Sequence, residues 1–254
     1  MHNAYFGECG ITPKSAQRNN KQKTKQLRCQ SRESSAVPAA LQKVSHRTSI
    51  QSDLLEMLIR NEISPGQHIS EETLAATNGV SRTPVREALI LLERQNLVVN
   101  EPNRGFFAAS ASLAGLRNYF DMASWLFPFL VQRAIRNLRG EITQPAAALL
   151  NADADEPAGD LLVKHFDFVS SVALAAQNPF AADTMIAGEA FHCMTRTSIL
   201  ADTPTEVAHE SNAQILEQDH HLIDMIKSGK GDEAAESVKA AIADARTFLA
   251  SQSI

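Results

Sequence analysis

The stretch from residue 70 to residue 107 constrains the fold more than any other part of this chain. It begins with Ser70, which suits a helix N-cap, and two glutamates that favour the positive end of a helix dipole. Asn78 and Gly79 end that helix, because this pair readily takes the left-handed conformation of a C-cap. Only Val80 separates Gly79 from Ser81, which starts a second helix, and Pro84 falls in the first turn of that helix, where a missing N–H costs little. The stretch therefore predicts a helix-turn-helix.

The second helix carries a buried face and a polar leading end. Apolar side chains recur at helical spacing at Val85, Ala88, Leu89 and Leu92. Arg82, Thr83 and Arg86 lie in its first two turns, from which a recognition helix reaches base edges in the major groove. Arginine there can bind guanine O6 and N7 with two hydrogen bonds. The alternative is a surface helix pair with solvated arginines.

Two short strands follow, predicted at 97–99 and 105–108 and joined by residues 100–104. This connection predicts the tip of a wing, with Arg104 near the DNA backbone or the minor groove. The run Ser-Arg-Thr-Pro-Val-Arg-Glu-Ala-Leu at 81–89 closely resembles the winged helix-turn-helix of the GntR family of bacterial transcription regulators. The run Ile-Ser-Pro-Gly-Gln-His-Ile-Ser-Glu-Glu at 63–72 is similar to its FadR-type (FCD) branch. The resemblance implies that DNA is contacted by Ser81, Arg82, Thr83, Pro84, Arg86, Asn103, Arg104 and Gly105.

The net charge of -5 does not by itself favour a nucleic-acid partner. Residues 43–110 hold seven basic and eight acidic side chains, so DNA binding depends on where Arg82, Arg86, Arg94 and Arg104 point. Because non-specific attraction between this domain and DNA is weak, we expect a dimer that binds two half-sites.

The three cysteines are scattered along the chain, so they predict no disulfide framework and fit a reducing cytoplasm. No apolar run is long enough to cross a membrane.

Composition and periodicity divide the chain into three parts. Residues 1–42 are basic and lack hydrophobic periodicity, which predicts a disordered tail. This tail is either a basic arm that adds phosphate contacts or a solvated extension, including one that arises from an upstream start codon. Residues 43–110 form the predicted winged domain, whose first helix covers 46–61. Residues 111–254 predict an all-α bundle with helices from residue 113 onward and near 160–176, 179–199, 204–228 and 232–251, and with a loop or frayed helix end over 144–159. The fold class is thus mainly α.

The helical half resembles the FCD domain, chiefly at Asn178-Pro179 and in the run from Ile226 to Ala235. The resemblance implies a domain that binds an effector and dimerises. It places the ligands of the metal-binding members at His165, Val169, Asp219 and Ala241. Two candidate metal ligands, His165 and Asp219, are too few for a closed site, unless a shifted helix register adds His220 or His221. The sequence therefore assigns no cofactor, and the alternative is a divalent metal such as zinc.

Many relatives carry an arginine near Ala123 that can hold an effector carboxylate, and this chain does not. The loss of this arginine and of two metal ligands argues against a simple dicarboxylate as the effector. It favours a more apolar or amide-bearing small molecule as the effector. The candidate effector-binding residues are His165, Asp219, His192, Arg196, Asn212 and Trp125, in a pocket shared with Phe127, Phe168 and Phe191. The alternative for the aromatic residues is core packing, and for His165 and Asp219 it is a hydrogen bond to each other.

These patterns predict a cytoplasmic homodimer that binds an inverted repeat in double-stranded DNA and regulates transcription. The resemblance favours a repressor whose operator affinity changes when a small metabolite binds in the helical bundle. The alternative is a DNA-binding dimer whose C-terminal domain has lost effector and metal binding and only dimerises. We do not expect an enzyme, because no nucleophile-base pair or complete metal set is visible and the C-terminal part is wholly helical.

Overall fold

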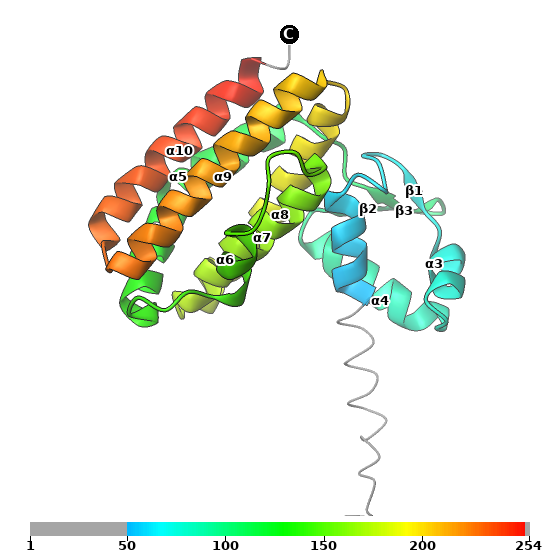
Figure 1. Cartoon of the computed structure of the whole chain (residues 1–254). Coiled ribbons are helices and arrows are strands. Elements are labelled where there is room, and N and C mark those ends of the chain that lie inside the picture. The colour runs from blue at the N-terminus through cyan, green and yellow to red at the C-terminus, as the bar shows by residue number, and fades with distance from the viewer. Residues whose placement is uncertain (1–49, 252–254) are drawn as a thin grey trace, which may run out of the picture. The chain divides into compact units, whose positions relative to one another are not determined.

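The computed structural model describes residues 50–251, and its N-terminal part is a winged helix-turn-helix (Figure 1). A helix over 50–59 is followed by β1 (His68–Ile69), α3 (Glu71–Thr77), α4 (Arg82–Arg94), β2 (Val98–Glu101) and β3 (Gly105–Ala108). The helices and the strands β2 and β3 follow the order that the sequence predicts, and β1 is additional. The predicted tail over 1–42 and the start of the helix predicted at 46–61 lie outside the described residues.

Local capping explains where α3 ends and α4 begins. The Ser70 side chain accepts a hydrogen bond from the Thr73 amide, as the sequence predicts. Gly79 takes the left-handed conformation at φ +63°, which favours glycine in the turn between α3 and α4. Ser81 occupies the N-cap position of α4, but its side chain makes no capping hydrogen bond.

The three strands form one antiparallel sheet in the order β1-β3-β2. Ile69 pairs with Phe106, and Val98 pairs with Ala108, so β3 lies between the other two strands. Asn103 at φ +64° and Gly105 at φ +90° allow the tight hairpin between β2 and β3. This hairpin is the predicted wing.

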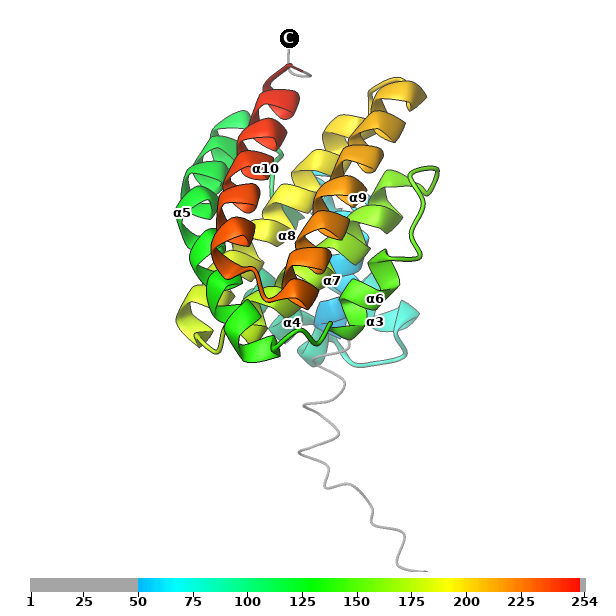
Figure 2. The same cartoon turned by 60° about the vertical axis from the view of Figure 1, so that its left-hand side comes forward.

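The C-terminal part is a bundle of long helices (Figure 2). Its elements are α5 (Leu113–Leu138), α6 (Gln144–Leu149), α7 (Ala158–Ala175), α8 (Pro179–Ala201), α9 (Thr205–Ser228) and α10 (Gly231–Ser251). Both views show α10 beside α5 and α9, in agreement with their contacts. Within residues 50–251, no helix is long and apolar enough to cross a bilayer.

The prediction of a loop over 144–159 is wrong at its start, where α6 forms. Thr143 caps this short helix by accepting from the Ala146 amide, and Pro145 sits in the first turn, where it does not interrupt hydrogen bonding. Ala146 and Leu149 form the buried face of this helix. The proline that suggested a break therefore begins a helix.

Two hydrophobic clusters share helices α7 and α8. The bundle cluster joins α5, α7, α8, α9 and α10, and its buried members include Phe120, Leu130, Phe168, Ile223 and Leu249. The head cluster holds the core of the winged domain together with Phe166 of α7 and Cys193 and Met194 of α8. The described residues accordingly cluster as one compact unit.

A close backbone contact lies between the start of α7 and the end of the first described helix. A Cβ atom placed on Gly159 would lie 2.9 Å from Arg60 Cα, which is backbone that cannot move aside cheaply. Next to it, the Arg60 guanidinium forms an ion pair with Asp160. The contact requires glycine at position 159.

Gly159→Ala should lower the free energy of unfolding by about 1–3 kcal/mol, because overpacking at a rigid contact forces a backbone shift. Gly231→Ala is the matched control, since a Cβ there meets only ordinary contacts at 3.9 Å or more. Urea unfolding of both variants measures the difference. Equal stability of the two variants would show that the contact at residue 159 is not tight.

Candidate nucleic-acid interface and bundle cavity

The leading end of α4 presents polar side chains to solvent while its other face is buried. Val85, Ala88, Leu89 and Leu92 are fully buried in the head cluster. Ser81, Arg82, Thr83 and Arg86 are exposed, and Pro84 is half-buried. The structure thus brings the predicted α4 residues to one accessible helix end, the part of a recognition helix that contacts bases.

Three arginines of this surface pair with nearby glutamates. Arg82 Nη2 lies 2.7 Å from Glu72 Oε2, and Arg86 Nη1 lies 3.2 Å from Glu71 Oε1. On the wing, Arg104 pairs with Glu101. The three arginine side chains are 56–68% exposed, so each pair contributes only about 0–1 kcal/mol to stability. The guanidinium groups can therefore exchange these partners for phosphates or base edges.

Aromatic rings of β3 position two of these guanidinium groups. The Arg86 guanidinium lies 5.5 Å from the centre of the Phe106 ring, and that of Arg104 lies 5.1 Å from the Phe107 ring. Asn103 is exposed at the wing tip and Gly105 begins β3. The wing and α4 thus carry all eight residues predicted to contact DNA.

A second feature is a cavity of about 70 Å³ inside the helical bundle. Its walls come from α5, α7, α8, α9 and α10. The polar lining residues are Tyr119, His165, Glu189, His192, Arg196, Gln218, Asp219 and Ser237. The remaining lining is apolar and includes Phe120, Phe127, Val169, Leu222 and Ala241. A water needs about 10–15 Å³ by this measure, so the cavity admits a few waters or a compact ligand.

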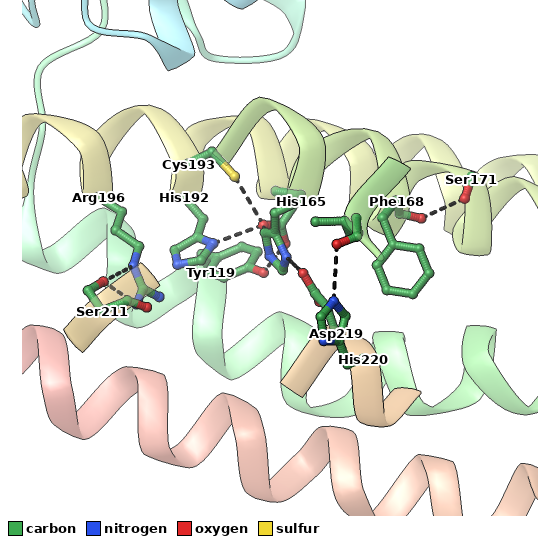
Figure 3. A network of polar contacts seen from close by, with 12 residues as sticks. Tyr119, His165, Phe168, Ser171, His192, Cys193, Arg196, Ser211, Asp219 and His220 are labelled. Atoms are coloured by element: carbon green, nitrogen blue, oxygen red, sulfur yellow. Dashed lines mark hydrogen bonds and ion pairs between the residues drawn. The ribbon is translucent and has the colours of Figure 1, made fainter. Parts of the chain in front are cut away.

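The carboxylate of Glu189 is the centre of a buried polar cluster on this cavity. Figure 3 shows its partners Tyr119, His165 and His192. Tyr119 donates its hydroxyl to Oε2. His192 Nδ1 lies 2.9 Å from Oε1, while His165 Nε2 and Cys193 Sγ each lie 3.3 Å from the same oxygen. Burial opposes ionisation of Glu189, but His192 and His165 hold its pKa well below the usual value. The carboxylate is thus ionised and fully partnered.

His165 links Glu189 to Asp219. Its Nδ1 lies 2.7 Å from Asp219 Oδ2, as expected if the two buried polar groups satisfy each other. Burial alone would lower the pKa of His165, yet Asp219 and Glu189 together raise it to about 10. Burial lowers the pKa of His192, and this ring is neutral. His192 Nε2 has no hydrogen-bond partner in the described part of the chain.

Arg196 supplies a buried positive charge at the same cavity. Its guanidinium donates to the Ser211 hydroxyl at 2.7 Å from Nη2 and lies 5.6 Å from the centre of the Phe248 ring. Burial lowers its pKa to about 10, so the group stays charged at neutral pH. The cavity therefore joins an ionised network to an apolar wall.

Two predicted effector residues lie elsewhere. Trp125 is 85% exposed on α5 and does not line the cavity, so its place in the predicted pocket is wrong. Asn212 is buried, but its side chain donates to the Ala154 and Glu156 carbonyls and holds the chain before α7. His165, His192, Arg196 and Asp219 do line the cavity.

Sequence reasoning missed Tyr119 and Glu189. A usable signal is the spacing of Glu189 and His192, which places both on one face of α8 within a largely apolar run. Tyr119 offers no such signal, because it lies 70 residues from its partner. Of the ligand positions implied by the resemblance, Val169 and Ala241 also line the cavity but offer no donor atom, so that ligand set does not fit this chain.

Comparison with known proteins finds sequence similarity in the winged helix-turn-helix part of the chain. Residues 47–108 match the model described as bacterial regulatory proteins, gntR family. An uncharacterized HTH-type transcriptional regulator of Streptomyces ambofaciens is 46% identical over 65 residues, which cover 26% of this chain and 28% of that protein. The Nta operon transcriptional regulator of Aminobacter aminovorans is 34% identical over 94 residues, or 37% of this chain and 43% of that protein. The match thus spans less than half of either relative.

Two solved structures share the fold over most of the chain. One is a putative GntR transcriptional regulator from Rhodococcus sp. RHA1, with a TM-score of 0.61 and 21% identity over 81% of this chain and 98% of that one. The other is E. coli McbR/YncC, with a TM-score of 0.65 and 20% identity over 81% of this chain and 97% of that one. At this identity, the likeness describes the architecture.

Tyr119→Phe should lower the free energy of unfolding by about 1–3 kcal/mol, because it leaves one oxygen of a buried carboxylate without its donor. The stacking of residue 119 on His192, with ring centres 4.8 Å apart, is kept in this variant. Thr184→Val removes an exposed hydroxyl from α8 and should change stability by less than about 0.5 kcal/mol. Thermal unfolding that does not separate the two variants would contradict the role given to the Tyr119 hydroxyl.

Proposed function

We propose that this chain, whose residues 47–108 are a helix-turn-helix domain of the gntR family, is a sequence-specific DNA-binding regulator of transcription. The observation that carries this proposal is the exposed leading end of α4. It holds Arg82, Thr83 and Arg86 above a fully buried helix face. An arginine in this position can bind a guanine edge while the buried face keeps the helix in a fixed orientation.

The charge arrangement of the head supports sequence reading over non-specific attraction. The DNA-facing arginines are paired with Glu71, Glu72 and Glu101, so approach to any polyanion is only weakly favoured. A correct base sequence offers bidentate hydrogen bonds that replace those weak pairs. The affinity for the correct DNA sequence is then much higher than the affinity for non-specific DNA.

We further propose that the protein acts as a homodimer on an inverted repeat and that the helical half is of the FCD type. A dimer adds the binding free energies of two half-sites, so it binds far more tightly than a single head. Its two-fold symmetry also matches a palindromic operator. A matched relative in E. coli, 41% identical over 56 residues, carries the name HTH-type transcriptional repressor RspR. The name of this relative supports the proposal that the protein represses transcription.

The helical half then has the role of sensing a small molecule. Support comes from the bundle cavity, where an ionised cluster and Arg196 meet an apolar wall. The second candidate function of the helical half is dimerisation alone. It is favoured by Val169 and Ala241, which line the cavity at two metal-ligand positions implied by the resemblance but have no donor atom. A metabolite screen by thermal shift separates the two, because a bound ligand raises the melting temperature of the folded state.

Selection of bound sequences from a random duplex library tests the DNA-binding proposal. We expect the wild-type protein to enrich an inverted repeat. Arg86→Ala should bind the enriched duplex about 10- to 100-fold more weakly, since one bidentate arginine-base pair contributes about 1–3 kcal/mol of discrimination. Fluorescence anisotropy on that duplex measures the change.

Arg246→Ala is the charge-matched control, because Arg246 is an exposed residue of α10 paired with Asp121 and far from the head in sequence. It should bind within twofold of the wild type. The proposal fails if folded wild-type protein enriches no sequence, or if the two arginine variants lose affinity equally.

A further inference from the structure

Glu72 is an acidic side chain on the surface that the arginines of α4 present to DNA. Its Oε2 lies 2.7 Å from Arg82 Nη2, and its side chain is 78% exposed. A carboxylate in this place repels the phosphates of any duplex that approaches, unless it has a partner on the DNA. We propose that Glu72 is a specificity-determining residue. Its carboxylate accepts a hydrogen bond from the N4 amino group of a cytosine in the major groove, while Arg82 binds the guanine of the same base pair.

The packing of α3 on α4 fixes where Glu72 and Arg82 leave the protein. Leu74 and Ala75 of α3 are buried in the head cluster, and so is Val85 of α4. The ion pair joins the two helices at the surface next to this core. Both side chains therefore extend from neighbouring points of one rigid unit and reach neighbouring atoms of a bound duplex.

The hydrogen-bonding groups of this ion pair complement the major-groove edge of a G·C base pair. In that edge guanine presents O6 and N7 as acceptors, and the cytosine beside it presents the N4 amino group as a donor. The guanidinium of Arg82 offers only donors, and an ionised carboxylate such as that of Glu72 offers only acceptors. Each member of the ion pair thus has its complement on one of two bases that lie side by side.

Binding to this base pair leaves neither charged group without a partner. If Arg82 turned to guanine alone, the Glu72 carboxylate would lose its partner close to the phosphates, which opposes binding. When the carboxylate accepts from cytosine N4 at the same time, the ion pair is exchanged for hydrogen bonds to both bases. A G·C pair with guanine facing Arg82 offers two acceptors to the arginine and a donor to the carboxylate, which no other base pair does.

The neighbouring Glu71 is placed for a different role. Its side chain is only 27% exposed, and its Oε1 lies 3.2 Å from Arg86 Nη1. The guanidinium of Arg86 also lies 5.5 Å from the centre of the Phe106 ring. Glu71 therefore orients Arg86 from the protein side, whereas the more exposed Glu72 can reach a base edge.

The inference rests on the proposed DNA-binding function, and it names one base pair of each half-site that two helices read together. Its test uses the inverted repeat selected by the wild-type protein, with N4-methylcytosine placed at one cytosine of each half-site at a time. The methyl group removes the N4–H that faces the major groove and leaves the base pair intact. Fluorescence anisotropy measures the affinity of each methylated duplex.

We expect one cytosine position at which methylation weakens binding of the wild-type protein about tenfold, because the carboxylate loses its donor there. Glu72→Ala has no acceptor to lose, so methylation at that position should change its affinity by less than twofold. Melting curves verify that the variant is folded, which the exposure of Glu72 leads us to expect.

Glu101→Ala is the matched control, because Glu101 is a glutamate of the wing that pairs with Arg104. It removes an equal charge from the same surface and should keep the tenfold effect of methylation. The inference is overturned if methylation at no cytosine weakens wild-type binding. It is also overturned if Glu72→Ala keeps the wild-type sensitivity, since Glu72 is then only a partner of Arg82. Failure of the DNA-binding proposal is seen separately, as wild-type protein that enriches no repeat.

Discussion

Helices α7 and α8 each contribute buried side chains to both hydrophobic clusters, and the rest of the structure depends on this constraint. On α7, His165 lines the cavity while its neighbour Phe166 is buried in the head cluster. On α8, His192 lines the cavity while Cys193 packs towards the head. Adjacent residues of a helix point about 100° apart, so a rotation of either helix moves both side chains. Helices α7 and α8 therefore contact both the cavity and the core of the winged domain.

A buried carboxylate explains why the cavity is polar at one end. Glu189 in an apolar bundle would be costly without partners, and four side chains from α5, α7 and α8 direct hydrogens to it. Each of those groups is constrained in turn, His165 by Asp219 and His192 by stacking on Tyr119. A network of this kind is rigid when complete, so it holds the facing helices at a fixed separation.

The winged domain could be predicted from sequence because its signals are local. The cap at Ser70, the left-handed Gly79 and Pro84 in a first turn act over a few residues, and the structure has all three. The long helices of the bundle followed from their 3.6-residue periodicity. Helix α6 was missed because Pro145 and the acidic run after it suggested a loop, whereas Thr143 provides a cap.

The cavity was harder to predict because its residues meet only through tertiary packing. The resemblance to the FCD domain placed His165 and Asp219 at ligand positions, and both line the cavity together with His192 and Arg196. Trp125 was misplaced because periodicity gives a face of α5 but not the neighbour that covers it. Glu189 was missed because a lone glutamate ordinarily indicates a solvated position, and its partner Tyr119 comes from a distant helix.

The central claim is that α4 reads guanine edges in the major groove through Arg82 and Arg86. Methylation interference on the selected duplex tests it most directly, because guanine N7 lies in the major groove and accepts a hydrogen bond from arginine. The account predicts that N7 methylation of guanines in each half-site blocks binding. Binding that tolerates methylation at every guanine N7, but not at adenine N3 in the minor groove, would contradict it.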